Sequence, residues 1–204
     1  MPPNAVLARL LCLLVGYVFG SFLTAEVVAR AVAGKSARQL GSGNPGMANI
    51  TAQLGPKAGL VVLAGDLLKT AAACGVGYAA AAPVLGWLSI LYAGFGAVLG
   101  HNFPLWAKGK GGKGVAVTCA WVFLYLPVTG ALCCLAGGAV VLWLGYLPLG
   151  AVVIAVLAVP AAWIQQGTES GLILLLNAVI MISRHFCGLK RIASGTEHQF
   201  FRRK

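Results

Sequence analysis

The sequence predicts an all-α integral membrane protein with about seven transmembrane helices, and three observations lead to this prediction. Of its 204 residues, 59% are hydrophobic and only 9% are charged, and the mean hydropathy is +0.88. Soluble globular chains are about 45–50% apolar and about 25% charged. The apolar residues form long runs, and a spanning helix needs about 20 such residues. The basic residues gather in clusters between the runs. We expect one integral membrane domain over residues 1–204.

The apolar runs define the expected helices in chain order. The first run covers residues 5–32, and no small-residue cleavage site follows it, so we expect a membrane helix rather than a removed signal peptide. The other runs cover residues 59–82, 84–103, 115–145, 147–165 and 171–186. The run 115–145 is too long for one straight span, and Pro127 lies near its middle. It is either one kinked helix or two short helices that meet at a tight turn.

The positions of the charges favour two short helices there. Apart from Arg9 and Lys69, every Lys and Arg lies within residues 30–57, 108–113 or 184–204. Cytoplasmic loops are enriched in Lys and Arg, and all three clusters reach that side only if the chain crosses the membrane seven times. We therefore expect the N-terminus outside and the C-terminus in the cytoplasm. The net charge of +11 then indicates contact with anionic lipid, and no nucleic-acid-binding module is visible.

Two glycine-rich loops are candidate anion sites. Residues 109–114, the Gly-Lys loop, read Gly-Lys-Gly-Gly-Lys-Gly. Consecutive backbone amides can cradle a phosphate there, and Lys110 and Lys113 can neutralise it. The alternative is a basic loop that only follows the positive-inside rule. The first loop, residues 41–49, contains Ser42, Asn44 and Asn49 among glycines; it suits a turn, a helix N-cap at Ser42 or Asn49, or an anion site.

Several ionisable residues lie inside or at the ends of apolar runs. Asp66 and Lys69 share one helix face, and such groups are either a structural ion pair or part of a substrate site. His101 and His185 each lie at a helix end, where histidine serves as a cap, a packing residue or a proton-transfer group. Glu26 is expected at the membrane interface, and His198 in solvent.

Other chemistries are excluded by missing patterns. The six cysteines show no CxxC or zinc-type spacing, so we expect reduced thiols, no disulfide, no metal and no cofactor. The Gly-Lys loop follows no strand, which excludes a dinucleotide-binding fold. Trp106 stands where an acyltransferase of the His-x₄-Asp type requires aspartate.

Taken together, the polar motifs resemble the bacterial acyl-phosphate:glycerol-3-phosphate acyltransferases of the PlsY family. The resemblance covers nearly the whole chain, in six ordered blocks. They are Gly20-Ser21; Gly41-Ser42-Gly43-Asn44 with Gly46 and Asn49; Asp66-Leu67-Leu68-Lys69; Gly100-His101-Asn102-Phe103-Pro104; Lys110-Gly111-Gly112-Lys113-Gly114-Val115-Ala116; and His185 with Lys190-Arg191 and Gly195-Thr196-Glu197.

The resemblance implies a fold and an activity. The family has seven membrane helices, needs no metal, and transfers a fatty acyl group from acyl phosphate to glycerol-3-phosphate, giving lysophosphatidic acid and phosphate. It places the enzyme in the bacterial inner membrane with its active face in the cytoplasm. It implies that Ser42, Lys113 and His185 are catalytic; either His185 or the substrate phosphate accepts the proton. The implied substrate-binding residues are Gly43, Asn44, Gly46, Asn49, Asp66, Lys69, His101, Asn102, Lys110, Gly111, Gly112 and Glu197.

Three positions depart from the family pattern. The family commonly has Thr, Arg and Asn where this chain has Ala48, Ala52 and Gly188. An arginine–phosphate fork is a strong and specific contact. Its absence leaves three hypotheses: a different acceptor, a substitute cation such as Lys57 or Arg38, or a divergent paralogue that only binds a phosphorylated ligand. A small transporter is a further, less favoured alternative.

Overall fold

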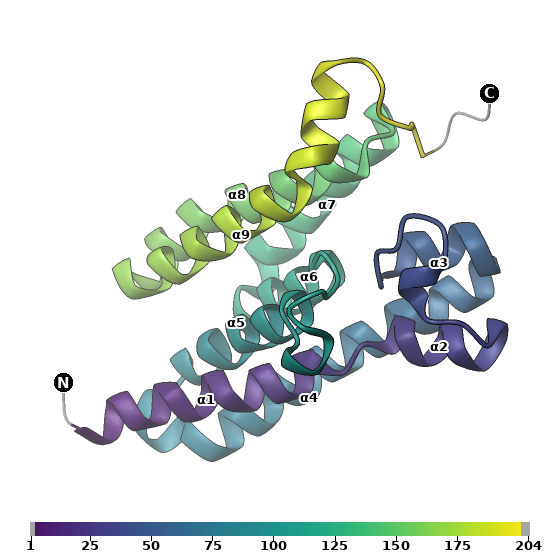
Figure 1. The fold of residues 1–204 in the computed structure, drawn as a ribbon. Coiled ribbons are helices and arrows are strands. Elements are labelled where there is room, and N and C mark those ends of the chain that lie inside the picture. The colour runs from purple at the N-terminus through teal and green to yellow at the C-terminus, as the bar shows by residue number, and fades with distance from the viewer. Residues whose placement is uncertain (1–2, 201–204) are drawn as a thin grey trace. The chain divides into compact units, whose positions relative to one another are not determined.

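The computed structural model describes residues 3–200, and no β-strand occurs among them. Helices and short 3₁₀ turns follow one another along the chain (Figure 1). The elements are α1 (Pro3–Ser21), α2 (Thr24–Ala33), η1 (Ala37–Gln39), α3 (Met47–Leu54), α4 (Pro56–Leu85), α5 (Leu88–Asn102), η2 (Leu105–Ala107), α6 (Val115–Tyr125), α7 (Pro127–Leu144), α8 (Leu147–Gln166) and α9 (Thr168–Ala193). This all-helical fold agrees with the prediction.

The chain divides into two compact units, residues 1–121 and 122–204. In the first unit, α1, α4 and α5 pack against one another, and α2 and α3 pack on α4 (Figure 1). In the second unit, α8 packs against both α7 and α9. The expected single domain over residues 1–204 stays a prediction.

Small residues bring α1 and α5 into backbone contact. Gly16 and Gly20 face α5, and Gly96 and Gly100 face α1. A Cβ atom added at any of these glycines would overlap a backbone carbonyl of the opposite helix. Membrane helices associate closely where such small residues line the interface. This contact fixes the ends of α1 and α5, from which the loops of the candidate site emerge.

The run 5–32 is long and apolar enough to cross a membrane, but it is not the one continuous helix expected. Phe22 and Leu23 separate α1 from α2. A break frees backbone carbonyls that need new hydrogen-bond donors in an apolar environment. Trp106 Nε1 donates to Ser21 O at 2.8 Å, and Lys69 Nζ donates to Phe22 O at 2.7 Å. Side chains distant in sequence therefore stabilise the break.

The run 115–145 contains two helices, which confirms the favoured expectation of two helices over one kinked helix. Helix α6 has 11 residues and ends at Tyr125, and α7 has 18 residues and begins at Pro127. A Cβ atom at Gly130 would overlap Val122 O, so the chain turns tightly between them. Among the described residues, five helical stretches are long and apolar enough to cross a membrane. They are Asn4–Ala33, Pro56–Leu85, Pro127–Leu144, Leu147–Gln166 and Thr168–Ala193. Seven spans thus stay a prediction.

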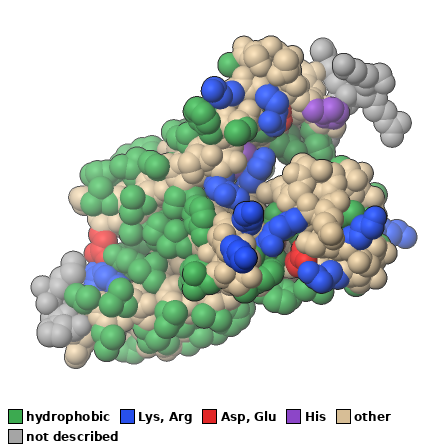
Figure 2. Space-filling model, in the orientation of Figure 1, with side chains coloured by type: hydrophobic (Ala, Val, Ile, Leu, Met, Phe, Trp, Pro, Cys, Tyr) green, Lys and Arg blue, Asp and Glu red, His purple; other side chains and the backbone are tan. Residues whose placement is uncertain are grey.

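The surfaces of the long helices are apolar. Figure 2 shows hydrophobic side chains covering much of the visible face, with few acidic ones. Leu135 and Trp143 on α7 are 68% and 92% exposed, and Leu68 on α4 is 70% exposed. Large exposed apolar surfaces on a soluble monomer are rare, whereas lipid covers them in a bilayer. The chain is therefore a multi-pass membrane protein.

The first prediction concerns Gly188, which packs against α8. A Cβ atom there would lie 2.6 Å from Pro148 Cγ, within a ring that has little freedom to move. We expect Gly188→Asn to lower stability by about 1–3 kcal/mol, because overpacking displaces neighbouring atoms. The measurement is thermal unfolding in detergent.

Two variants control this experiment. Gly138 on α7 would meet no atom within 4 Å of an added Cβ, so Gly138→Ala should not lower the unfolding temperature. Adding Pro148→Ala to Gly188→Asn should recover much of the loss. An unfolding temperature for Gly188→Asn equal to that of the wild type contradicts the packing argument.

Candidate functional site

The segment that leads into the first loop is anchored by Glu26 of α2. This carboxylate is only 7% exposed and accepts from Ser36 Oγ at 2.9 Å and from Ala37 N at 3.0 Å. Its other oxygen pairs with Arg30 Nε at 2.7 Å. The sequence suggested only an interfacial residue, because the four-residue spacing to Arg30 gives no sign of the contacts ten and eleven residues away. Glu26 thus fixes η1, which carries Arg38.

Asn49 shapes the first loop from within. Its Oδ1 accepts from Ser42 N at 2.9 Å, and its Nδ2 donates to Leu40 O at 2.9 Å. The first loop forms a turn, with Gly43 N donating to Leu40 O at 2.9 Å. The alternative of a helix N-cap at Ser42 or Asn49 is not found, since Asn49 lies inside α3 and Gly46 is the N-cap residue, with no side-chain hydrogen bond. The expected role of Asn49 in substrate binding stays a prediction. The Ser42 side chain is exposed, and that of Asn44 is half-buried.

Four backbone amides of the Gly-Lys loop, those of residues 109–112, donate to carbonyls within the fold. Gly111 N donates to Asn102 O at 3.1 Å, and Gly112 N donates to His101 O at 3.0 Å. Lys110 N likewise donates to Ala107 O at 3.0 Å. These four amides therefore bind backbone carbonyls and not the anion of the expected nest. The glycines instead let the loop backbone lie directly on the end of α5.

What the loop presents outward is side-chain charge. Lys110 is exposed and Lys113 is half-buried. Lys113 and Gly114 directly precede α6, and the first amides of a helix have no partner within it. A lysine beside a helix N-terminus suits an anion. The side chain of Asn102 lies against Gly114; it is fully buried, and neither polar atom has a hydrogen-bond partner among residues 3–200.

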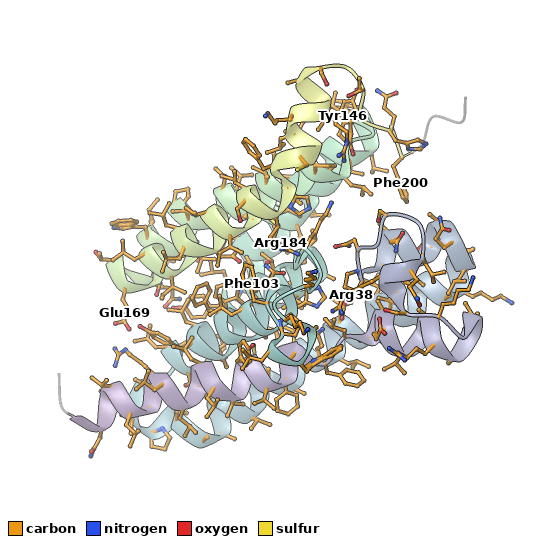
Figure 3. All side chains as sticks on the ribbon, viewed as in Figure 1. Arg38, Phe103, Tyr146, Glu169, Arg184 and Phe200 are labelled. Carbon is orange, nitrogen blue, oxygen red and sulfur yellow. The ribbon has the colours of Figure 1, made fainter. Side chains whose placement is uncertain are left out.

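Arg38, in η1 just before the first loop, contacts the Gly-Lys loop. Its Nη2 donates to Lys110 O at 2.5 Å, and its guanidinium lies over the Trp106 ring, 5.7 Å from the centroid. Its buried Nε atom has no hydrogen-bond partner within residues 3–200. Figure 3 labels Arg38 where its side chain extends from the η1 segment toward the Gly-Lys loop. The sequence identified this residue only as one of two candidate substitute cations.

Asp66, Lys69 and His101 form a buried cluster behind the Gly-Lys loop. They are 3%, 7% and 3% exposed. Lys69 Nζ lies 2.8 Å from Asp66 Oδ1 and 2.9 Å from His101 Nδ1. The ion pair expected as one alternative is present, and the histidine joins it.

An apolar hollow of about 630 Å³ adjoins the break between α1 and α2. It is lined by Tyr17, Val18, Ser21, Phe22, Leu23, Glu26, Val27, Leu105 and Trp106. A second hollow of about 450 Å³ shares Val18 and Phe22 with it. Trp106 thus contacts both the apolar hollow and Arg38, which places an apolar surface beside the basic loops.

The second unit carries the remaining candidates. His185 on α9 is 3% exposed, and its Nδ1 atom donates to Met181 O at 3.0 Å. Glu197, expected in substrate binding, pairs with Arg191 Nε at 2.5 Å. Phe200 N donates to Gly145 O at 2.8 Å, so the C-terminal segment returns to the turn before α8, near Tyr146 (Figure 3). His198 is exposed, as expected.

Neither a disulfide nor a metal cluster is found in the described part of the chain. All six cysteines are free thiols. No group of three or more His, Cys, Asp or Glu side chains among residues 3–200 is placed to hold a metal ion.

Comparison with known proteins identifies the family. The family model described as glycerol-3-phosphate acyltransferase matches residues 10–195. The chain is 39% identical over 170 residues to glycerol-3-phosphate acyltransferase 1 of Lactobacillus johnsonii, covering 83% of this chain and 82% of that one. It is 35% identical over 191 residues to glycerol-3-phosphate acyltransferase 2 of Moorella thermoacetica, covering 93% and 96%.

Solved structures agree with this assignment. The crystal structure of PlsY, an integral membrane glycerol 3-phosphate acyltransferase, in its glycerol 3-phosphate form has a TM-score of 0.83 and 28% identity, over 94% of this chain and 95% of that one. Its lysophosphatidic acid form has a TM-score of 0.81 and 27% identity. The chain belongs to the glycerol-3-phosphate acyltransferase family.

Proposed function

We propose that this chain transfers a fatty acyl group from acyl phosphate to the hydroxyl of glycerol-3-phosphate, giving lysophosphatidic acid and phosphate. The observation that carries this proposal is the Arg38 bridge, which joins η1, just before the first loop, to the Gly-Lys loop. The bridge gathers the cations of two distant segments beside an apolar hollow. The relatives support it, since they are named for this acceptor and a solved one has glycerol 3-phosphate and lysophosphatidic acid forms.

The reaction demands little covalent chemistry from the protein. Acyl phosphate is already activated, so the enzyme orients two anions and stabilises charge on the carbonyl oxygen and the departing phosphate. Lys113 at the start of α6, with Lys110 and Arg38, would neutralise the phosphates. Ser42 would donate its hydroxyl proton to a substrate oxygen, and Asn44 would contact the head group. The acceptor hydroxyl attacks the carbonyl carbon, and the carbon–oxygen bond to phosphate breaks.

The proton of the acceptor hydroxyl needs a base. Because the Nδ1–H of His185 is held by Met181 O, Nε2 is the nitrogen that carries the lone pair in the neutral ring. His185 can therefore accept the proton, and the substrate phosphate is the alternative acceptor.

We assign the acyl chain of the donor to the apolar hollow at the break between α1 and α2. The hollow is lined mainly by apolar side chains, among them Val18, Phe22 and Leu105. Burying each methylene of a chain contributes about 0.8 kcal/mol. Its edge at Trp106 adjoins the guanidinium of Arg38, so a chain lying there would bring its phosphate end to the basic loops.

We also propose how the chain replaces the guanidinium missing at Ala52. Arg38 already contacts the Gly-Lys loop at Lys110 O and the Trp106 ring. Lys57 lies exposed in the first turn of α4, and no hydrogen bond or ion pair joins it to either loop within residues 3–200. Of the two candidate cations, Arg38 is therefore favoured. A different acceptor is the second hypothesis, and the departures at Ala48, Ala52 and Gly188 motivate it.

The topology follows from the same charges. We propose seven spans, with α5 and α6 added to the five long stretches. The N-terminus lies outside, and the basic loops and C-terminal segment lie at the cytoplasmic face of a bacterial membrane. The distribution of Lys and Arg supports this orientation.

Replacing Lys113 tests the function directly. Purified protein should release phosphate from acyl phosphate only when glycerol-3-phosphate is present. Lys113→Ala should lower this rate by about 100-fold or more, the typical effect of removing a group that stabilises developing charge. Lys57→Ala is the matched control and should retain activity. Failure of the wild type to release phosphate, under conditions in which an ordinary family member does, would refute the proposal.

Replacing Arg38 tests the substitute guanidinium. Arg38→Lys keeps the charge but loses the planar fork, so we expect KM for glycerol-3-phosphate to rise by about tenfold or more. Lys57→Gln should leave KM within about twofold. Adding Ala52→Arg to Arg38→Lys should lower KM again. Equal effects at positions 38 and 57 would contradict the assignment.

A further inference from the structure

The ammonium of Lys69 supplies a hydrogen bond to the backbone at the break between α1 and α2. Phe22 O lies at this break, in an apolar segment where an unpaired carbonyl is costly. Lys69 reaches it from α4 and donates at 2.7 Å. The side chain of Lys69 is 5% exposed, so its charge is almost fully removed from water.

All three donors of this ammonium are used. Besides Phe22 O, Nζ contacts Asp66 Oδ1 at 2.8 Å and His101 Nδ1 at 2.9 Å. Asp66 Oδ1 in turn accepts from Thr24 Oγ1 at 3.3 Å, at the start of α2. A charged amine has three donors and no acceptor. The cluster therefore joins the first residue of α2 to α4 and to the end of α5.

These contacts fix the tautomer of His101. An ammonium only donates, so Nδ1 accepts and the ring proton of the neutral imidazole lies on Nε2. The Nε2 side of the ring faces the Gly-Lys loop, because a Cβ atom at Gly112 would overlap Nε2. Lys69 thereby sets the orientation of a ring on which the loop lies.

The backbone around His101 holds the same loop. His101 O accepts from Gly112 N, and Asn102 O accepts from Gly111 N. A Cβ atom at Gly111 would overlap His101 O. The next residue along the chain is Lys113. The position of its ammonium therefore depends on how the Gly111–Gly112 backbone lies on α5.

We propose that Asp66, Lys69 and His101 are positioning residues, which hold the Gly-Lys loop so that Lys113 meets the acyl phosphate, and that they do not contact substrate. This replaces the direct substrate contacts expected from the sequence, and the catalytic part of the proposal rests on the proposed function. A displacement of about 1 Å in a catalytic group costs about 100-fold in rate. The expected effect thus falls on kcat.

Two substitutions of His101 separate positioning from direct contact. In His101→Asn, the side-chain oxygen takes the place of Nδ1 and can accept from Lys69. In His101→Leu, that acceptor is lost. We expect kcat of His101→Asn to stay within about tenfold of the wild type, and kcat of His101→Leu to fall by about 100-fold. KM for glycerol-3-phosphate should change little in either variant.

A second measurement does not depend on activity. Hydrogen exchange of the Gly111 and Gly112 amides should be faster in His101→Leu than in the wild type and in His101→Asn. Thr70→Val is the matched control, because Thr70 is fully buried one turn after Asp66 on α4 and its hydroxyl, within residues 3–200, bonds only to Asp66 O. It should leave both kcat and exchange unchanged. The double variant Asp66→Asn, Lys69→Met avoids an unpaired buried charge and should also speed exchange.

Rescue by Asn, together with slow exchange in that variant and fast exchange in His101→Leu, supports positioning. Equal loss of kcat in both His101 variants with exchange as in the wild type overturns it, since His101 then acts on substrate. Wild-type behaviour in both variants also overturns it. If the wild type transfers no acyl group, the proposed function fails, and the exchange rates alone decide whether the cluster holds the loop.

Discussion

The first unit depends on one buried ammonium. Lys69 Nζ donates a hydrogen bond to the carbonyl of Phe22 at the helix break. The same ammonium is the counter-charge of the Asp66 carboxylate and fixes the orientation of the His101 ring. Removing one partner of a buried ion pair typically costs about 3–5 kcal/mol, because the other charge stays unpaired. The close α1–α5 contact supplies the rigid frame, since Gly20 and Gly100 place the break beside the end of α5. The positions of the loops therefore depend on α1 and α5, which cannot shift independently of each other.

The sequence predicted the helices well and their interruption poorly. Long apolar runs identify spans because hydrophobicity is a local property of the chain. The tight turn before Pro127 was one of two expectations for the same reason, since proline acts on its own segment. The break at Phe22 has no proline. It is stabilised by Lys69 and Trp106, which lie more than 40 residues away in the chain, and no local pattern reports such partners.

The candidate site shows the same division. The sequence identified Lys110 and Lys113 as site residues, which stays a prediction, and it did not predict that the glycines lie on the end of α5. Glycine permits a backbone to approach either an anion or another backbone. Which of these occurs depends on whether a carbonyl lies within reach, and here His101 O and Asn102 O take the amides. The anchoring role of Glu26 was missed because the donors to its carboxylate, Ser36 Oγ and Ala37 N, follow a turn whose geometry the sequence does not specify.

The same reasoning gives the departure at Ala52 a physical meaning. A guanidinium that binds phosphate from a free rotamer loses side-chain entropy on binding. Arg38 is already held by Lys110 O on one side and by the Trp106 ring on another, so much of that entropy is lost during folding. The N–H group of its Nε atom, buried and without a partner among residues 3–200, can still donate a hydrogen bond to a phosphate. A cation held in this way needs fewer neighbours to bind a phosphate than a mobile one does. The absence of an arginine at position 52 of α3 is therefore compatible with a working head-group site, provided that η1, which carries Arg38, stays anchored at Glu26.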